Sequence, residues 1–247
     1  MKGLIIAAGR GSRLQPVQDI KPLAPLFGSA LIERVILACR EVGINDITVV
    51  TGYQAEAVSA FLDVLGDRLG IPVRTIRHDF WDHFENGMSV LAARDCFDAP
   101  FLLTMTDHIF DPAVPEKLLS TRLDRGEIAL AVDHDTANPF VDLDDVTRVC
   151  TENGRVVAIG KGMKAYNGFD TGVFLASPAL FDAIEESMRQ NGDSSLSGGV
   201  RLLAAEAKVH AVDVSGRFWV DVDDPVSLWR AENALLGRFE DSCYGVS

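Results

Sequence analysis

The sequence predicts an α/β protein with a mostly parallel sheet that is covered by helices on both faces. Strand-like and helix-like segments alternate through the first 105 residues, which is typical of βαβ units. A glycine-rich loop follows the first strand, and polar residues follow a later apolar strand, as expected at the ligand-binding edge of such a sheet. The chain has 247 residues, 47% of them hydrophobic, so we expect one domain over residues 1–247.

The elements of the first half follow from residue type and spacing. Residues 29–42 carry apolar side chains at helical spacing, and Gly43 ends that pattern. Residues 46–51 are rich in β-branched side chains, which favours a strand. The same reasoning predicts strands at residues 3–8, 46–51, 73–77 and 101–105, and helices at residues 29–42, 53–65 and 88–95.

The second half is less regular, with shorter apolar runs and no repeat, low-complexity tract or obvious linker. Strands are predicted at residues 128–132, 155–159, 169–175 and 209–214, and helices at residues 178–188 and 225–236.

Composition excludes several classes of function. The chain has 36 acidic and 23 basic residues and a formal net charge of -13, so we do not expect nucleic-acid binding. No apolar run is long enough for a signal sequence or a membrane span. The cysteines are far apart and form no CxxC pair, which argues against a disulfide framework or a zinc site; they are Cys39, Cys96, Cys150 and Cys243. We therefore expect a soluble, cytoplasmic protein.

The loop after the first strand contains the pattern G-x-G-x-R. Gly9 and Gly11 allow a tight turn, and the exposed N–H groups of such a turn can bind phosphates. Leu14 stands where a dinucleotide-binding fingerprint needs its third glycine, and the lysine pattern of a P-loop is absent. Arg13 and Lys21 would neutralise a triphosphate held by this loop. The alternative is an ordinary strand–helix turn with two solvated cations.

Aspartates lie at two places where a metal site is expected. Asp107 follows the apolar strand of residues 101–105, and residues 219–223 alternate so that Asp221 and Asp223 would share one face of a short strand. Carboxylates from two segments suit Mg²⁺, which keeps waters and takes phosphate oxygens as its other ligands. Which of Asp221 and Asp223 is the main ligand stays open, and most acidic side chains are simply solvated. His108 is expected to pack or to support a ligand rather than to act as a base.

Together these segments resemble a known family. Residues 7–14 with Lys21-Pro22-Leu23 are similar to the loop shared by sugar-phosphate and alcohol-phosphate nucleotidyltransferases. Nearly the whole chain resembles the inositol-1-phosphate cytidylyltransferase domain, through residues 85–91, 103–109, 139–142, 154–161, 170–174 and 219–223. The resemblance implies a three-layer α/β/α, Rossmann-like nucleotidyltransferase domain with a mostly parallel, mixed sheet. It also implies CTP as the nucleotide and Mg²⁺ as the cofactor.

The resemblance also implies roles for individual residues. Arg13 and Lys21 would hold the triphosphate, and Lys161 would face the acceptor phosphate. Asp107, Asp221 and Asp223 would bind the metal, and Asp142 and Asp170 would bind the acceptor. The nucleotide would lie against Ala7, Ala8, Gly9, Gly11, Asn86 and Ser89. Two departures, Thr106 for a small residue and Asp224 for a threonine, remove no charge that the reaction needs.

The expected reaction is in-line attack of an acceptor phosphate on the α-phosphorus of CTP, giving CDP-inositol and pyrophosphate. The acceptor phosphate is already an anion, so positioning and charge neutralisation suffice, without a protein nucleophile. Three other readings stay open. These are a phosphocholine, aminoethylphosphonate or sugar-1-phosphate nucleotidyltransferase, a metal-dependent glycosyltransferase, and an inactive regulatory subunit that binds nucleotide. In some relatives this domain is fused to a membrane-embedded phosphodiester synthase, which we expect here as a separate protein.

The acceptor is inferred from the region between residues 133 and 171. Its polar side chains outnumber its aromatic ones, which favours a polyol such as inositol 1-phosphate, because each unpaired buried polar group costs about 1–3 kcal/mol. The polar residues are Asp133, His134, Asp135, Asn138, Asp142, Asn167, Asp170 and Thr171. A choline head would instead need aromatic faces, which Phe80, Trp81 and Phe84 could supply. We expect that run to cover the nucleotide or to pack in the core.

Overall fold

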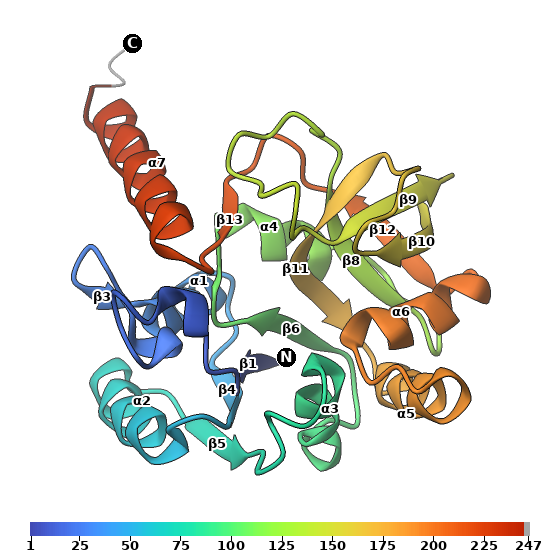
Figure 1. Cartoon of the computed structure of the whole chain (residues 1–247), viewed down its shortest axis with the longest axis horizontal. Coiled ribbons are helices and arrows are strands. Elements are labelled where there is room, and N and C mark those ends of the chain that lie inside the picture. Colours follow the sequence, from blue (N-terminus) through green and yellow to red (C-terminus); the bar gives the residue numbers. More distant parts are fainter. Residues whose placement is uncertain (245–247) are drawn as a thin grey trace.

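The structure is a computed structural model; it describes the backbone of residues 1–244 and the side chains of residues 1–237. Its strands alternate with helices along the chain (Figure 1). The strands are β1 (Lys2–Ala7), β2 (Pro25–Leu26), β3 (Ser29–Ala30), β4 (Asp46–Thr51), β5 (Val73–Arg77), β6 (Phe101–Met105), β7 (His108–Phe110), β8 (Ile128–Asp133), β9 (Arg148–Glu152), β10 (Arg155–Gly160), β11 (Gly168–Ala176), β12 (Val209–Asp213) and β13 (Trp219–Asp221).

The helices are distributed over both halves of the chain. The α-helices are α1 (Leu31–Glu41), α2 (Ala55–Leu69), α3 (Asn86–Leu91), α4 (Ala113–Leu119), α5 (Ala179–Asn191), α6 (Leu196–Ala205) and α7 (Pro225–Tyr244). Three short 3₁₀ turns are η1 (Ser12–Leu14), η2 (Lys21–Leu23) and η3 (Arg94–Cys96).

A nine-stranded sheet of order β5-β4-β1-β6-β11-β8-β12-β10-β9 forms the centre of the protein. The strands β5, β4, β1 and β6 are parallel, whereas β11 runs antiparallel to both β6 and β8. Because β9 pairs with β11 as well as with β10, the last five strands of that order form a closed ring of pairings. The predicted mixed sheet is confirmed, with parallel pairing concentrated in the first half.

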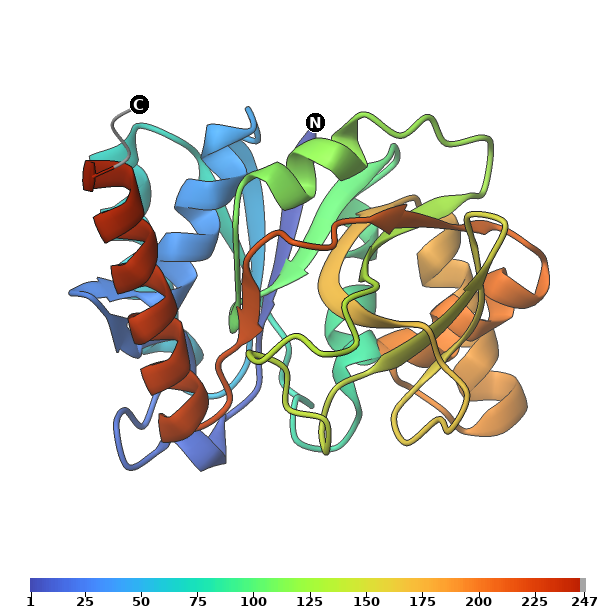
Figure 2. The ribbon, with the colours of Figure 1, turned by 90° about the horizontal axis from the view of Figure 1, so that it is seen from above.

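Helices cover both faces of the sheet, which confirms the three-layer architecture (Figure 2). Alternate side chains of a strand point to opposite faces, and β1 shows this directly. Ile5 packs with α1, α2, α4 and α7, whereas Leu4 and Ile6 pack with α3, α5 and α6. A strand buried on both faces reads as a continuous apolar run, as the first strand does.

Some elements were not predicted. The strand β9 and the helices α4 and α6 fall where the sequence showed no clear pattern, and α2 and α7 are longer than expected. The short strand predicted over residues 219–223 ends at Asp221, so Asp223 lies beyond it; the proposed common strand face was wrong. Cys39, Cys96 and Cys150 are free thiols, whereas Cys243 lies outside the described side chains.

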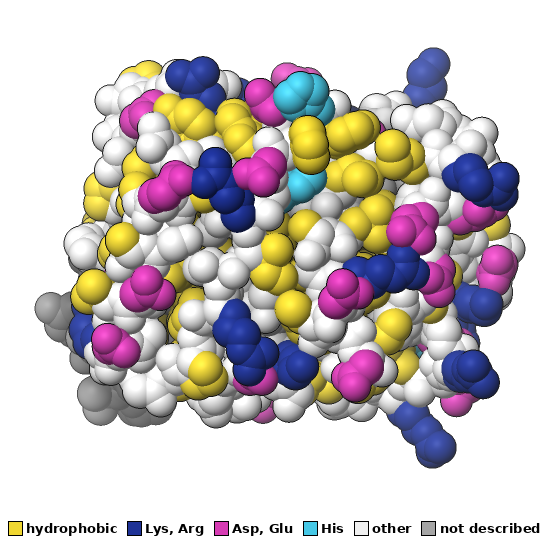
Figure 3. Space-filling model, turned by 90° about the horizontal axis from the view of Figure 1, so that it is seen from below, with side chains coloured by type: hydrophobic (Ala, Val, Ile, Leu, Met, Phe, Trp, Pro, Cys, Tyr) yellow, Lys and Arg dark blue, Asp and Glu magenta, His cyan; other side chains and the backbone are white. Residues whose placement is uncertain are grey.

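Among the described residues, no helix has the length and the apolar character that crossing a membrane requires. On the face drawn in Figure 3, basic and acidic side chains are interspersed with apolar ones. The surplus of negative charge is therefore not gathered into one patch on that face.

The parallel strands bring two loops together at their carboxyl ends. Ile6 of β1 pairs with Met105 of β6, so the loop after residue 7 and the turn containing Asp107 emerge side by side. The backbone N–H of Thr106 also donates to the carbonyl of Ile6 at 3.0 Å. This edge of the sheet is where α/β proteins bind ligands.

The short helix α3 is fixed against the segment that leads into α6. Asn86 accepts a hydrogen bond from the N–H of Leu196 at 3.0 Å, and the N–H of Glu85 donates to Ser194 Oγ at 3.1 Å. A Cβ at Gly87 would lie only 2.4 Å from the carbonyl oxygen of Ser194. The glycine therefore permits the close approach that places Asn86.

We expect Gly87→Ala to lower the free energy of unfolding by about 2 kcal/mol, because the added methyl group collides with backbone atoms. Gly237→Ala in α7 is the matched control, since a Cβ there meets nothing within 4 Å. That change should be neutral or stabilise the helix by up to about 1 kcal/mol. Urea unfolding of both variants measures the difference, and equal stability of Gly87→Ala and the unsubstituted protein would contradict the packing described.

Candidate active site

A cavity of about 790 Å³ lies at the carboxyl ends of β1 and β6. The predicted site residues converge on it, although they come from segments spread over the chain. Those that line it are Ala7, Ala8, Gly9, Gly11, Arg13, Lys21, Asn86, Asp107, Asp142, Lys161, Asp170, Asp221 and Asp223. The exception is Ser89, which is buried in α3 outside the cavity lining.

The glycine-rich loop closes directly over Lys21. Gly11 has a φ of 64°, in the left-handed region that favours glycine. A Cβ at Gly11 would meet the aliphatic stem of Lys21 at 2.4 Å, so the loop and this side chain fit together only without one. Lys21, at the start of η2, is consequently only 5% exposed.

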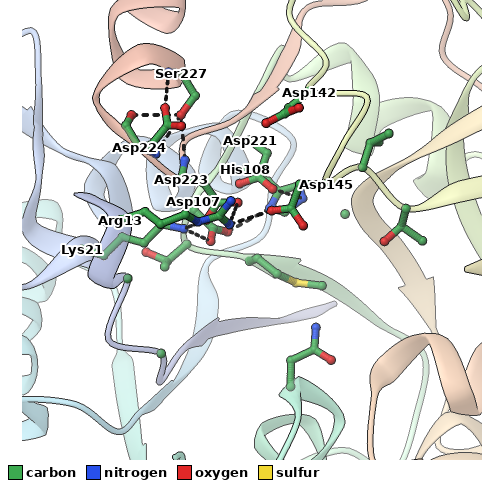
Figure 4. Close-up of a pocket in the computed structure, with 18 of the residues that line it drawn as sticks. Arg13, Lys21, Asp107, His108, Asp142, Asp145, Asp221, Asp223, Asp224 and Ser227 are labelled. Carbon is green, nitrogen blue, oxygen red and sulfur yellow. Dashed lines mark hydrogen bonds and ion pairs between the residues drawn. The ribbon is translucent and has the colours of Figure 1, made fainter. Parts of the chain in front are cut away.

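The buried ammonium of Lys21 joins two acidic segments. It donates to Asp107 Oδ2 at 2.6 Å and forms a short ion pair with Asp223 Oδ1 (Figure 4). Burial alone would lower the pKa of Lys21, but the charges of Asp107, Asp223 and Asp221 outweigh burial and raise it. Burial likewise opposes ionisation of Asp107, and Lys21 with His108 still holds the pKa of Asp107 well below its usual range. Both groups are therefore charged.

A second cluster forms where β7 meets β13. The antiparallel register places Asp221 opposite His108, whose Nδ1 lies 2.9 Å from Asp107 Oδ1 and whose Nε2 lies 4.0 Å from Asp221 Oδ2. Burial would lower the pKa of His108, but Asp221 and Asp107 raise it to about 9. Burial raises the pKa of Asp221 to about 7, although 39% of its side chain faces the cavity. His108 thus supports the carboxylates as an ion partner.

These residues fit a divalent metal ion. A carboxylate oxygen of Asp107, a carboxylate oxygen of Asp221 and a ring nitrogen of His108 lie within 4.8 Å of one another; because His108 is charged, the two carboxylates are the donors that this group offers to a metal. Asp221 Oδ1 is buried and has no hydrogen-bond partner among the residues that the structure describes, which is the state of an acceptor that a cation would complete. Asp223, in contrast, is already paired with Lys21 and Arg13. Hard oxygen donors of this kind suit Mg²⁺.

The ion pairs continue from this cluster across the cavity mouth. Arg13 Nη2 donates to Asp223 Oδ2 at 2.7 Å and to Asp145 Oδ2 at 2.6 Å, and Asp145 Oδ1 pairs with Lys161. The three candidate catalytic cations are therefore held in one chain of alternating charge; Figure 4 shows the part of it that runs from Lys21 through Asp223 and Arg13 to Asp145.

The region predicted to bind the acceptor contributes less than expected. Of its eight named polar residues, Asp142 and Asp170 line the cavity. The carboxylate of Asp133 is buried and instead accepts from Trp219 Nε1 and Asn138 Nδ2, both at 2.8 Å. It fixes the strand that carries Asp221. The simple excess of polar over aromatic residues was thus a poor measure of the acceptor site.

The aromatic run before α3 does not line the cavity. Trp81 packs edge-on against Tyr53 with ring centroids 5.5 Å apart, and Phe80 is 61% exposed beside His83. Phe84 is 42% exposed. The run therefore forms no aromatic cage around the acceptor side in this structure.

Sequence reasoning missed Asp145, although it pairs with two of the predicted cations. It stands in a run of aspartates whose side chains also make local turns; Asp142 accepts from the N–H of Asp144 at 3.0 Å. Nothing in that run distinguishes one carboxylate from another. His108 was seen but its contact with both Asp107 and Asp221 depends on strand pairing.

Comparisons with solved structures support the same fold. The inositol-1-phosphate CTP transferase from T. maritima superimposes with a TM-score of 0.82 at 21% identity, covering 94% of each chain. A UDP-glucose pyrophosphorylase bound to UDP-glucose gives a TM-score of 0.78 at 18% identity.

Curated relatives extend the comparison to sequence. A bifunctional IPC transferase and DIPP synthase from Rubrobacter xylanophilus is 35% identical over 94% of this chain and 51% of its own length. The Aquifex aeolicus protein of the same name is 30% identical over similar shares. The chain thus spans about half the length of these relatives. The family model of the MobA-like NTP transferase domain matches residues 3–209. Together with the glycine-rich loop and the acidic cluster, this match confirms the predicted nucleotidyltransferase domain and shows that the chain belongs to the MobA-like NTP transferase family.

Proposed function

We propose that this chain transfers a cytidylyl group from CTP to inositol 1-phosphate with the help of Mg²⁺, giving CDP-inositol and pyrophosphate. The observation that carries the proposal is the buried Lys21, clamped between Asp107 and Asp223 beside the glycine-rich loop. It supports the proposal because a cation that could bind phosphate and a carboxylate that could bind a metal, Asp107, then lie together in one cavity. We also infer that residues 1–247 act as one domain, because a single sheet runs from β5 to β9.

The relatives support the choice of substrates. The Rubrobacter xylanophilus and Aquifex aeolicus proteins are named as IPC transferases, and the T. maritima neighbour as an inositol-1-phosphate CTP transferase. The second activity in the bifunctional names belongs to those longer proteins and is not included in the proposal for this chain.

The nucleotide side suits a pyrimidine base. The oxygen of Asn86 accepts from the N–H of Leu196, so the amide NH₂ is left to face the cavity. A cytosine offers acceptors at O2 and N3 to such a donor. The glycine-rich loop, Arg13 and Lys21 line the same cavity and would hold the triphosphate.

The mechanism needs no protein nucleophile. An oxygen of the acceptor phosphate forms a bond to the α-phosphorus of CTP while the bond from that phosphorus to the pyrophosphate oxygen breaks. Arg13 and Lys21 hold the leaving pyrophosphate, and Lys161 holds the attacking phosphate against charge repulsion. Asp107 and Asp221, with His108 beside them, would bind Mg²⁺. When bound, the ion neutralises charge on the triphosphate oxygens.

The acceptor side favours a polyol phosphate over a choline phosphate. Quaternary ammonium groups are recognised by aromatic faces, and the run Phe80, Trp81 and Phe84 lies outside the cavity lining. Asp142 and Asp170 present oxygen acceptors that suit hydroxyl groups. Lys161 supplies the cation for the phosphate.

With CTP saturating, we expect kcat/KM to be at least about tenfold higher for inositol 1-phosphate than for phosphocholine or aminoethylphosphonate, because Asp142 and Asp170 offer acceptors to the hydroxyl groups of a polyol, which the other two acceptors lack. Pyrophosphate release measures all three, and UTP with glucose 1-phosphate is run beside them. A tenfold preference for either amine would overturn the inositol assignment and leave the cytidylyl transfer standing. Activity with UTP and glucose 1-phosphate alone would overturn both.

We expect Lys21→Met to reduce turnover by about 10²–10³-fold, because a preorganised charge on the triphosphate is lost. In a chelator the variant should also lose about 3 kcal/mol of unfolding free energy, since buried carboxylates lose their cation. Mg²⁺ should restore part of that stability, because the ion binds only the folded site.

Lys208→Met is the matched control for this experiment. Lys208 pairs with Glu206 at 2.6 Å, but both side chains are largely exposed, so removing the pair should change stability by no more than about 0.5 kcal/mol. Thermal or urea unfolding with and without Mg²⁺ gives the comparison. If Lys21→Met is as stable as the unsubstituted protein in chelator, the stabilising role of the buried ion pair is contradicted. If Mg²⁺ restores none of the lost stability, the proposed metal site is contradicted.

A further inference from the structure

Asp145 lies between the two halves of the cavity. It belongs to the connection between β8 and β9, in a turn where the N–H groups of Asp145 and Val146 both donate to the carbonyl of Asp142, at 3.2 and 2.9 Å. The carboxylate is 27% exposed and faces across the cavity mouth toward the loop after β1 (Figure 4). A local backbone turn thus holds it in place independently of the ions it contacts.

The two oxygens of Asp145 bind cations from different parts of the chain. Oδ2 accepts from Arg13 Nη2 at 2.6 Å, and Oδ1 pairs with Lys161 just beyond the end of β10. Lys161 and Arg13 both hold the pKa of Asp145 low, at about 2, although its partial burial opposes this. The carboxylate is therefore charged at any pH where the enzyme would work.

Both cations keep free donors while they hold Asp145. In the described part of the chain, Arg13 makes its contacts to Asp145 and Asp223 through Nη2, which leaves Nε and Nη1 for another ligand. Lys161 has one such contact and two further N–H groups. Phosphates on the nucleotide side and on the acceptor side can therefore bind without displacing Asp145.

Without Asp145 the two cations would behave differently. Their side chains are 53% and 64% exposed; without Asp145, Lys161 would have no ion pair among the described residues, and Arg13 would keep only the one with Asp223. Two like charges beside one cavity also repel each other. A carboxylate between them offsets the repulsion and links the position of one cation to that of the other.

On this geometry we infer that Asp145 is a positioning residue, which holds Arg13 and Lys161 toward a common point so that binding of the nucleotide prepares binding of the acceptor phosphate. The inference rests on the proposed function for the assignment of Arg13 to the nucleotide and Lys161 to the acceptor. Asp145 touches no reacting atom and acts through the two cations.

The test is the coupling between the two substrates in Asp145→Asn. The dissociation constant of inositol 1-phosphate is measured by calorimetry with and without the non-transferable α,β-methylene analogue of CTP, in Mg²⁺. We expect the analogue to tighten inositol 1-phosphate binding in the unsubstituted enzyme, and this tightening to disappear in Asp145→Asn. Turnover should fall by about 10²-fold, as for a misplaced binding group, while the unfolding temperature is unchanged. Asp145→Glu should recover part of both effects.

Asp144→Asn is the matched control, because it removes the same charge from the neighbouring position and has no ion pair with Arg13 or Lys161 among the described residues. It should keep the coupling. Equal loss in Asp144→Asn, or full coupling in Asp145→Asn, would overturn the inference. Tighter binding of each ligand by Asp145→Asn with undiminished turnover would also overturn it, because Asp145 would then be a competitor of the phosphates.

The proposed function and this inference can fail separately. If the unsubstituted enzyme forms no product from CTP and inositol 1-phosphate, the substrate assignment fails. Binding of orthophosphate is then measured with and without inorganic pyrophosphate, in the unsubstituted enzyme and in Asp145→Asn. Pyrophosphate probes the nucleotide side of the cavity, and orthophosphate probes the acceptor side. Loss of their mutual coupling in Asp145→Asn would still support the positioning role, and its persistence would still overturn it.

Discussion

The buried ion pair of Lys21 with Asp107 and Asp223 is the constraint on which the rest of the site depends. A charge at 5% exposure is stable only with close counter-charges, so the loop after β1, the turn after β6 and the segment after β13 must meet at one point. Gly11 allows the first of these to approach, and the parallel pairing of β1 with β6 brings the second. The pairing of β13 with β7 brings the third.

The chain of alternating charges that begins at this ion pair explains how an acidic protein could bind two phosphorylated ligands. The cations of the cavity are neutralised within the chain itself, and their carboxylate partners are the groups that a divalent ion would need. Ligands would then meet charges that are already in place, which avoids the cost of organising them during the reaction. Asp221 differs from the paired carboxylates, since its Oδ1 has no hydrogen-bond partner within the described residues.

Sequence patterns predicted the parallel half of the sheet well, because β4, β5 and β6 are buried or β-branched runs with clear ends. They failed for α6, where Gly198 and Gly199 weaken the helical pattern. Those glycines are there because a Cβ would lie 2.5 Å from Ser187 Oγ or 2.6 Å from Ile184 Cγ1 of α5. In the site, the single acids after strands could be found by position, whereas Asp145 could not. Its Arg13 partner is 132 residues away, and only the tertiary fold brings them together.

We propose that the site works by positioning and charge, with direct attack on the α-phosphorus and no covalent enzyme intermediate. The most direct test is the stereochemical course of transfer from CTP that carries sulfur at one α-oxygen with known configuration, in Mg²⁺ with inositol 1-phosphate. A single in-line displacement predicts inversion of configuration at the α-phosphorus of the product, which ³¹P NMR can assign. Retention would show two successive displacements through a nucleotide-linked side chain and would contradict this account.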